Sequence, residues 1–315
     1  MSSIRLRRAV SAVAVLIASL ALLAAPAEAV KPPKTMAALG DSITRAFNTE
    51  INPPTCPLFL ATGFLDCPKN SWSTGTEPAV NSQYERIQAI NPGRNPVAFN
   101  DAASGARAEH LLGQAQAAAA QDPDYVTVLI GGNDACRPTI AEQTPTATFR
   151  GQVKAALDAL VSGDPKVYIQ VVSIPDINLL HALFTDPPDQ NALLRWSLFN
   201  VCQALLANPL SNEPADVERR ATFRAQVIAY NGALADVCAL YARCRFDGNL
   251  AFNSPFTRDD VANVTNTGGL NFPPFNAIPV FGPGNPNSTA DYFHPSLQGQ
   301  ATIAEGSWTA TFSFD

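Results

Sequence analysis

Four short apolar segments, separated by longer segments with helical spacing, restrict the fold of this chain more than any other feature of its sequence. They are residues 36–39, 96–100, 125–130 and 167–174. The third and fourth are apolar at successive positions, which is typical of strands buried on both faces of a parallel sheet. A fifth short strand is expected around Arg245 and Phe246. These segments predict a central, mostly parallel sheet of about five strands.

Helical segments lie between and after the predicted strands. They are residues 109–120, 149–161 and 217–241. The longest has Phe223, Val227 and Leu234 on one face, so this face is expected to pack against the sheet. Strands alternating with helices predict an α/β fold, a three-layer α/β/α sandwich with right-handed crossovers. In the flavodoxin-like strand order, the first strand lies between the second and the third.

Three segments do not follow this alternation. Residues 48–83 contain several prolines and two cysteines, and we expect a surface excursion closed by a disulfide. Residues 178–214 carry several leucines and are expected to add an apolar surface. Residues 249–291 contain five phenylalanines: Phe252, Phe256, Phe272, Phe275 and Phe281. Because phenylalanines are costly to leave in water, we expect a folded wall rather than a disordered loop.

The first 29 residues have the pattern of a secretory signal. Three arginines within the first eight residues precede an uncharged apolar stretch over 9–25, and Ala27-Glu28-Ala29 follows it. An apolar stretch of about 17 residues is short for a membrane anchor, so we predict a secreted protein whose residues 1–29 are removed. Residues 30–315 are then expected to form a single domain, since no charge run, repeat or Gly/Ser linker divides them.

The charge of the chain argues against two classes of partner. Lys and Arg number 21 against 27 Asp and Glu, which gives a formal net charge of −6, and after residue 29 the basic residues form no cluster. Nucleic acids and anionic membrane surfaces attract clustered positive charge. We therefore expect no nucleic-acid partner.

Six cysteines follow the predicted signal, and their even number in an exported chain predicts disulfides rather than a metal site. The chain has no CxxC motif and three histidines, so the sequence favours no zinc site. Six cysteines allow many pairings. Short separations favour Cys56–Cys67 and Cys238–Cys244, which leaves Cys136–Cys202.

Polar groups follow the first three predicted strands. Ser42 comes after the first strand in Leu39-Gly40-Asp41-Ser42, Gly105 after the second and Asn133 after the third. Ligands bind at the carboxyl ends of parallel strands, where these loops converge in the flavodoxin-like order. A hydroxyl, a glycine N–H and a side-chain amide are therefore expected to share one site. The alternatives are that Gly105 is only a turn glycine and that Asn133 only caps a helix.

Serine is a weak nucleophile until a base removes its proton, and three histidines are candidates for that base. His110 lies in a helical segment and fits a capping or surface role, and His181 lies in the leucine-rich segment. His294 follows Asp291 by three residues, a spacing that puts the carboxylate and the imidazole on one side of a turn. The alternative for this pair is a helix-capping Asp291 beside an exposed His294.

Four blocks in this order resemble the four sequence blocks of the SGNH hydrolases, also called the GDSL esterase/lipase family: Gly40-Asp41-Ser42, Gly105, Gly131-x-Asn133-Asp134 and Asp291-x-x-His294. The resemblance spans nearly the entire chain after the signal. The signal, the six cysteines and the phenylalanine-rich segment are similar to those of secreted actinobacterial lipases and esterases of this family. Ile43 stands where the family name has Leu, and the second block matches loosely.

This resemblance implies that Ser42 is the nucleophile, His294 the general base and Asp291 the residue that orients His294. It also implies an oxyanion hole formed by the backbone N–H groups of Ser42 and Gly105 and the side-chain amide of Asn133. The G-x-S-x-G elbow of other serine hydrolases is absent. Asp41 is expected to stabilise the turn that carries Ser42.

The resemblance further implies a secreted serine esterase or lipase, including phospholipases, that hydrolyses acyl esters of lipids through an acyl-enzyme. No cofactor and no metal are expected, and the chain is expected to be a monomer that contacts a lipid interface transiently. A carbohydrate acetylesterase and a secreted binding protein without turnover are the alternatives. The phenylalanine-rich and leucine-rich segments favour a longer acyl chain, since each buried methylene contributes about 0.8 kcal/mol.

Overall fold

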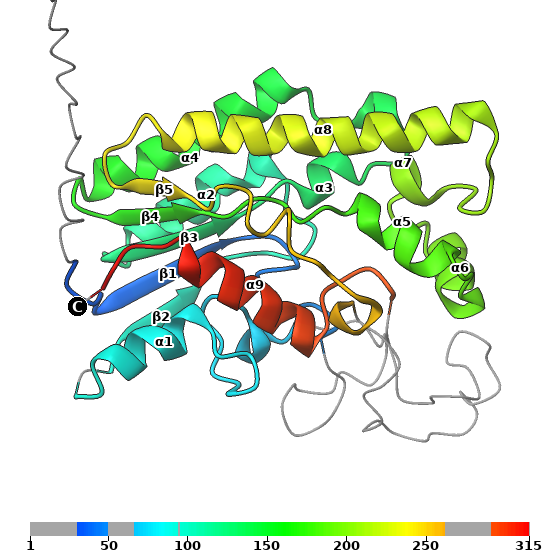
Figure 1. The fold of residues 1–315 in the computed structure, drawn as a ribbon. Coiled ribbons are helices and arrows are strands. Elements are labelled where there is room, and N and C mark those ends of the chain that lie inside the picture. Colours follow the sequence, from blue (N-terminus) through cyan, green and yellow to red (C-terminus); the bar gives the residue numbers. More distant parts are fainter. Residues whose placement is uncertain (1–29, 50–65, 94, 262–290, 315) are drawn as a thin grey trace, which may run out of the picture.

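The computed structural model describes residues 30–49, 66–93, 95–261 and 291–314 (Figure 1). Several expectations concern residues outside these ranges. They are the signal over 1–29, the Cys56–Cys67 pair because of Cys56, and the part of the predicted wall that contains Phe272, Phe275 and Phe281.

Five parallel strands form the sheet of the described chain. They are β1 (Thr35–Gly40), β2 (Val97–Asn100), β3 (Tyr125–Leu129), β4 (Tyr168–Val171) and β5 (Cys244–Phe246). Their order is β2-β1-β3-β4-β5, which confirms the predicted flavodoxin-like arrangement. Ala38 pairs with Asn100 on one side and with Thr127 on the other, so the loops after β1, β2 and β3 leave the sheet close together.

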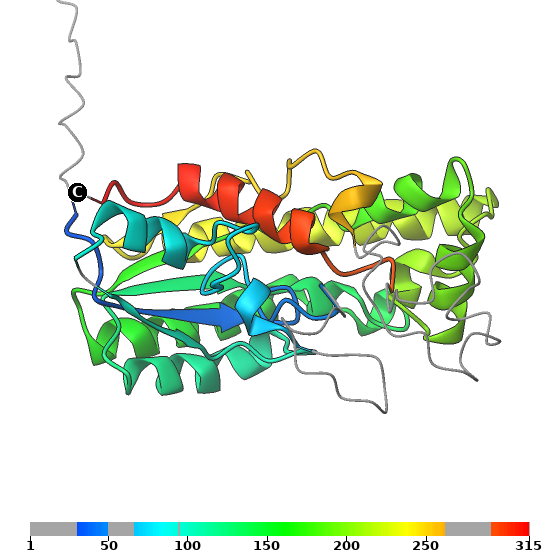
Figure 2. The same ribbon diagram turned by 90° about the horizontal axis from the view of Figure 1, so that it is seen from below.

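Helices cover both faces of this sheet (Figure 1). α2 (Ala108–Ala119), α4 (Thr146–Gly163) and α8 (Pro214–Cys238) lie on one face, where α4 contacts both of the others. These are the three predicted helices, and α8 begins earlier than expected because Pro214 is well suited to the first turn of a helix. α1 (Gln83–Ile90) and α9 (Leu297–Thr309) lie on the other face of the sheet. Figure 2, in which the molecule is seen from below, shows both helices on the same side of the strands.

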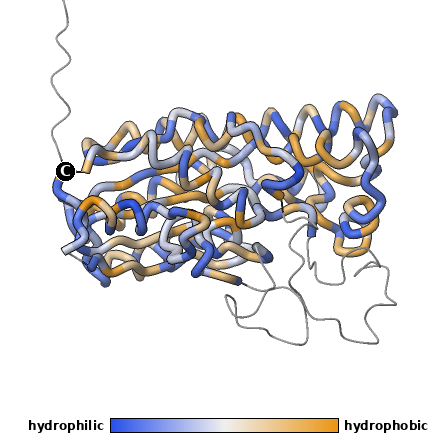
Figure 3. Tube along the Cα trace, turned by 60° about the horizontal axis from the view of Figure 1, so that its bottom comes forward, coloured by the Kyte–Doolittle hydropathy of each residue, from blue (hydrophilic) through white to orange (hydrophobic). Residues whose placement is uncertain are grey.

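Each strand contributes side chains to both layers of the core because successive residues of a strand point to opposite faces. Ala37, Leu39 and Val128 belong to the cluster formed with α2, α4 and α8. Met36 and Tyr125 pack instead with Ile87 of α1. The helices alternate between hydrophilic and hydrophobic residues along their length, as amphipathic helices do (Figure 3). This two-sided burial explains why the third predicted strand had no polar alternation.

The leucine-rich segment forms helices rather than a simple loop. It contains α5 (Asn178–Thr185), α6 (Gln190–Leu198) and α7 (Gln203–Leu206), which lie beyond the carboxyl ends of the strands (Figure 1). The short helix α3 (Gly132–Ala135) follows β3 on the same side of the molecule. Three 3-10 turns complete the described elements: η1 (Pro68–Asn70), η2 (Ile140–Glu142) and η3 (Arg258–Asp260).

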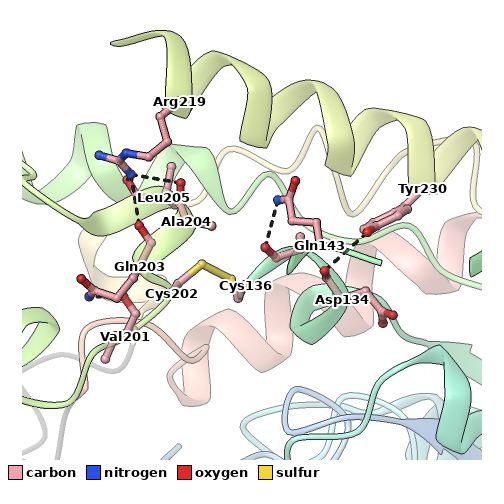
Figure 4. Close-up of a disulfide and its surroundings, with 11 residues drawn as sticks. Asp134, Cys136, Gln143, Val201, Cys202, Gln203, Ala204, Leu205, Arg219 and Tyr230 are labelled. Atoms are coloured by element: carbon pink, nitrogen blue, oxygen red, sulfur yellow. Dashed lines mark hydrogen bonds between the residues drawn. A yellow bond between two sulfur atoms is a disulfide. The ribbon is translucent and has the colours of Figure 1, made fainter. Parts of the chain in front are cut away.

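Two of the predicted disulfides are confirmed. Cys238–Cys244 joins the end of α8 to β5, and Cys136–Cys202 joins the segment after α3 to the start of α7. Near the second bridge, Arg219 of α8 donates hydrogen bonds to the carbonyl oxygens of Gln203, Ala204 and Leu205 (Figure 4). The bridge and Arg219 therefore hold α7 in place between α3 and α8.

None of the helices described by the structure has the length and apolar character needed to cross a membrane.

Candidate active site

Ser42 lies directly after β1, at a turn that depends on Gly40. Gly40 has φ of +149°, and a Cβ at this position would lie 2.3 Å from the carbonyl oxygen of Leu129. Any larger residue would therefore push β1 away from β3. The turn leaves Ser42 7% exposed at the edge of the sheet.

Gln114 of α2 holds the end of β1 from one side. Its Oε1 accepts the Gly40 N–H at 2.8 Å, and its Nε2 donates to the Gly40 carbonyl oxygen at 2.9 Å. Both contacts are buried, so Gln114 gives the Gly40 N–H its acceptor and shares the Gly40 carbonyl with the N–H of Ala103, which lies 3.1 Å from it. The sequence analysis did not single out Gln114. A lone Gln on the apolar face of an alanine-rich helix was the signal that could have revealed it.

His294 lies beside Ser42, although the two residues are 252 positions apart in the sequence. Its Nε2 is 2.9 Å from the Ser42 Oγ, a distance at which the hydroxyl donates to a neutral imidazole. On the opposite side of the ring, Nδ1 is 2.6 Å from the Oδ2 of Asp291. The structure therefore brings together in one chain of hydrogen bonds three residues that the sequence analysis selected.

Asp291 has further partners that hold its carboxylate in position. Its Oδ1 accepts the backbone N–H groups of Phe293 and His294, each at 2.9 Å. Its Oδ2 also accepts a hydrogen bond at 2.9 Å from the side chain of Asn48. Asn48 is a functional candidate that sequence reasoning missed, because it lies in the Pro-rich excursion and shows no motif. The backbone of Asn48 is left-handed (φ +56°), and the spacing of residues in the sequence does not indicate this conformation.

Burial and charge shift the pKa values of the pair in opposite directions. Burial alone would lower the pKa of His294, but the charge and hydrogen bond of Asp291 outweigh it and raise that pKa above its ordinary value of 6.5. Burial likewise favours the neutral form of Asp291. The charge of His294 and the hydrogen bonds that Asp291 accepts from His294 and Asn48 nevertheless lower the pKa of Asp291. Asp291 therefore remains ionised beside the imidazole.

Asn133 and Gly105 occupy different positions relative to Ser42. Asn133 lies in α3 and lines the same cleft as Ser42, and its Nδ2 donates to the carbonyl oxygen of Ala106 at 3.0 Å. Gly105 lies in the loop after β2, is exposed and has φ of +79°. A Cβ at Gly105 would meet no atom within 4 Å, so its backbone conformation rather than a lack of space accounts for glycine there.

The side chain of Asp41 stabilises the turn that carries Ser42. Its Oδ1 accepts the N–H of Ile43 at 2.9 Å, while its Oδ2 is buried without a hydrogen-bond partner among the described residues. Burial raises the pKa of Asp41 to about 7, although the Ile43 hydrogen bond and the charge of His294 act in the opposite direction. The nearby carboxylate of Asp134 adds to the rise. Asp41 is therefore a titratable group packed next to Ser42.

An apolar cleft of about 620 Å³, including space open to solvent, leads to Ser42. Side chains from α5, from the segment before it and from the η3 region form most of its wall: Ile177, Leu179, Leu180, Leu183, Phe256 and Val261. The polar groups in the cleft include Ser42, His294 and Asn133. The leucine-rich segment thus supplies the apolar surface that the sequence analysis expected.

The other two histidines lie in different environments. His110 accepts the backbone N–H of Arg107 at 3.1 Å at the start of α2, as expected of a capping residue. The Nε2 of His181 lies 2.6 Å from the carbonyl oxygen of Pro209, and burial lowers the pKa of His181. Within the described ranges, no group of three or more His, Cys, Asp or Glu side chains is arranged to hold a metal ion.

Comparisons with known proteins show the family of this chain. Residues 36–306 match the model of a family described as GDSL-like lipase/acylhydrolase. The membrane-associated phospholipase B1 of Rattus norvegicus is 30% identical over 201 residues, which cover 55% of this chain and 13% of the rat protein. Its counterpart from Homo sapiens is 25% identical over 303 residues, 88% of this chain and 19% of the human protein. The chain thus spans less than a fifth of these relatives.

An extracellular lipase and an acetyl xylan esterase are two of the solved structures that are similar to this chain. An extracellular lipase from Streptomyces rimosus is 18% identical with a TM-score of 0.46, and the match covers 88% of this chain and 100% of the lipase. An acetyl xylan esterase from Geobacillus stearothermophilus is 15% identical with a TM-score of 0.48, covering 89% of this chain and 95% of the esterase.

Proposed function

We propose that this chain, which belongs to the GDSL-like lipase/acylhydrolase family of ester hydrolases, is a secreted serine esterase that cleaves acyl esters of lipids. The observation that carries the proposal is the hydrogen-bonded series Ser42–His294–Asp291, with distances of 2.9 Å and 2.6 Å. In this proposal residues 1–29 are removed on export, and residues 30–315 work as one domain. The rat relative is named a phospholipase, which makes phospholipids one candidate substrate class.

The proposed reaction begins with a proton transfer from Ser42 to His294. The Oγ attacks the ester carbonyl carbon as its proton moves to Nε2, and Asp291 stabilises the imidazolium that forms. His294 then returns the proton to the leaving alcohol, and the carbon–oxygen bond to the alcohol breaks. Water hydrolyses the resulting acyl-Ser42 by the same route in reverse order, with His294 again acting as base.

The tetrahedral oxyanion needs donors, and Asn133 is the side chain best suited to supply one. A side-chain amide nitrogen carries two hydrogens, of which the carbonyl of Ala106 takes one. We assign the other to the oxyanion, together with the backbone N–H groups of Ser42 and Gly105. Loss of one such donor typically lowers the rate by about 10²–10³-fold.

The cleft supports an acyl chain longer than acetyl as the preferred substrate group. Its wall beside Ser42 is lined by Leu180 and Leu183 of α5 and by Phe256, and an acyl chain that enters it leaves water. Each methylene buried there contributes about 0.8 kcal/mol to binding, which is roughly a fourfold effect on specificity.

Labelling with a fluorophosphonate tests the nucleophile. We expect a covalent adduct on a peptide that contains Ser42, and we expect the Ser42→Ala variant to be folded, unlabelled and inactive. The Ser162→Ala variant is a matched control, because Ser162 is an exposed serine near the end of α4 and should leave labelling unchanged. Labelling that persists in Ser42→Ala would falsify the assignment.

A series of p-nitrophenyl esters from acetate to longer acyl chains tests the substrate class. We expect kcat/KM to rise with chain length over the first several carbons. A sharp preference for acetate would favour the carbohydrate acetylesterase. Binding of esters without hydrolysis of any of them would favour a secreted binding protein. Sequencing the amino terminus of the exported protein tests removal of residues 1–29.

A further inference from the structure

Tyr292 is the first of the two residues between Asp291 and His294, and it has an unusual backbone conformation. Its φ is +56°, in the left-handed region that non-glycine residues rarely adopt. Such a conformation is unfavourable for a residue with a side chain and persists only where its surroundings hold it in place. Tyr292 is nevertheless 1% exposed and neither Gly nor Asn, so surrounding side chains must stabilise this conformation.

Three side chains from the helices of the leucine-rich segment contact Tyr292. The indole Nε1 of Trp196 donates a hydrogen bond to the Tyr292 carbonyl oxygen at 3.1 Å. Phe184 packs edge-on against the Tyr292 ring, with centroids 5.4 Å apart. The guanidinium of Arg195 lies 5.2 Å from the centre of the same ring. Phe184 and Trp196 also pack on each other, with ring centroids 5.9 Å apart.

The conformation of Tyr292 decides where Asp291 lies relative to His294. The chain turns at Tyr292 so that the Oδ1 of Asp291 receives the N–H groups of the two following residues. The Oδ2 of the same carboxylate is then placed 2.6 Å from the imidazole Nδ1. A change in the Tyr292 backbone would move the carboxylate and the imidazole relative to each other. Trp196 contacts this turn at the Tyr292 carbonyl, and His294 at the end of the turn contacts Ser42.

We propose that Trp196, supported by Phe184, is a positioning residue that holds the Asp291–His294 pair in its hydrogen-bonding geometry by fixing the Tyr292 carbonyl. The inference rests on the proposed function, since it concerns the general base of that reaction. It gives the leucine-rich segment a second role besides lining the acyl cleft. α5 lines the acyl cleft with Leu180 and Leu183, and its last turn, together with α6, fixes the turn that carries the base.

The Trp196→Phe variant tests the proposal because it removes the indole N–H and keeps a buried aromatic ring. We expect kcat to fall about 10–100-fold, the range expected for small displacements of a catalytic group. We expect KM to change by less than about twofold, because the lost interaction does not bind substrate. The acid limb of kcat/KM should also move to lower pH, since a weaker bond from Asp291 raises the pKa of His294 less.

The shift of the acid limb of kcat/KM distinguishes a positioning role of Trp196 from a loss of folded protein. Titration of active sites with a fluorophosphonate corrects kcat for the folded fraction, and partial unfolding cannot move the acid limb. Trp308→Phe is the matched control, since Trp308 lies in α9 and packs against Phe314 rather than Tyr292. We expect wild-type kcat and pH dependence for that control.

A wild-type kcat and an unchanged acid limb in Trp196→Phe overturn the proposal. If Trp196→Phe does not fold, Phe184→Leu carries the test, because it removes the edge contact with Tyr292. The acid limb of kcat/KM in Phe184→Leu must then also move to lower pH. An acid limb at the wild-type position overturns the proposal. Neither result affects the assignment of Ser42, which depends on labelling of Ser42→Ala.

Discussion

Ser42 depends on residues that lie far away in the sequence. His294 and Asp291 come from the segment before α9, and Asn48 reaches Asp291 from the segment after β1. The sequence analysis selected Ser42, His294 and Asp291 because their spacing and order resembled a known pattern. Asn48 could not be found in this way, since its contact depends on a left-handed backbone and on the fold that brings the two segments together.

The raised pKa of His294 predicts the acid limb of the pH–rate profile. The general base must be neutral, so kcat/KM falls as the pH drops through the pKa of His294. Because Asp291 raises that pKa above 6.5, we expect the half-maximal point of the acid limb to lie on the alkaline side of this value. Fluorophosphonate labelling rates measured across pH report the same group in the free enzyme. A half-maximal point below that of a free histidine would contradict the prediction.

Asp41 predicts a pH dependence of stability. Its folded pKa is about 7 and its ordinary value is 3.8, so the folded state retains a proton that the unfolded state loses. The stability contribution of Asp41 is therefore fully present below the ordinary value and is lost as the pH rises through about 7. The Asp41→Asn variant does not titrate. We expect its free energy of unfolding, relative to wild type, to increase by on the order of 1–4 kcal/mol between about pH 4 and pH 8.

Urea unfolding at several pH values within this window measures the difference for Asp41→Asn. Asp158→Asn is a useful control because Asp158 is a surface carboxylate on α4, paired with Lys154. A constant difference between Asp41→Asn and wild type at all pH values would show that Asp41 titrates normally in the folded protein.

At the scale of elements, the end of β1 depends on α2. The sequence predicted both elements from their apolar patterns, but it did not predict that Gln114 would satisfy the backbone of Gly40. Helix periodicity identifies which face of α2 is buried. It does not identify the strand end that this face meets, because that depends on the crossover in which α2 connects β2 to β3.

The Gln114→Leu variant tests this contact between elements. It leaves the buried N–H of Gly40 without its acceptor, while the Gly40 carbonyl keeps the N–H of Ala103 at 3.1 Å, and this is expected to cost about 1–3 kcal/mol of stability. We also expect a lower kcat in the fraction that remains folded, because Ser42 follows Gly40 by two residues. Gln116→Leu is the control on the same helix, since Gln116 is exposed. Equal stability of the two variants would contradict the role of Gln114.

At the scale of the whole molecule, the disulfide Cys136–Cys202 joins the segment after β3 to the leucine-rich segment. The bridge spans 66 positions, whereas Cys238–Cys244 spans 6. A longer closed loop restricts the unfolded chain more strongly. The long bridge should therefore contribute more to stability than the short one.

Replacing both cysteines of a bridge by serine measures this difference. We expect Cys136→Ser/Cys202→Ser to lower the free energy of unfolding by about 3–4 kcal/mol and Cys238→Ser/Cys244→Ser by about 2 kcal/mol. The first variant should also lower kcat/KM for long-chain esters, because α5 and α6 lose an anchor near the cleft. Denaturant unfolding and the ester series measure the two effects. A larger loss of stability for the short bridge would contradict the loop-length argument.

The sequence was enough to predict the α/β class, because the alternation of strands and helices is visible in its apolar pattern, and the flavodoxin-like strand order followed as a common arrangement of that class. Short spacing predicted Cys238–Cys244, and elimination left Cys136–Cys202, which spans 66 positions. The sequence also selected Ser42, Asp291, His294, Asn133 and Gly105 as candidates. The tertiary structure alone decided that Gln114 holds Gly40, that Asn48 reaches Asp291 and that the leucine-rich segment packs on Tyr292. These contacts join residues far apart in the chain, and side chains meet in this way only after the strands and crossovers are in place.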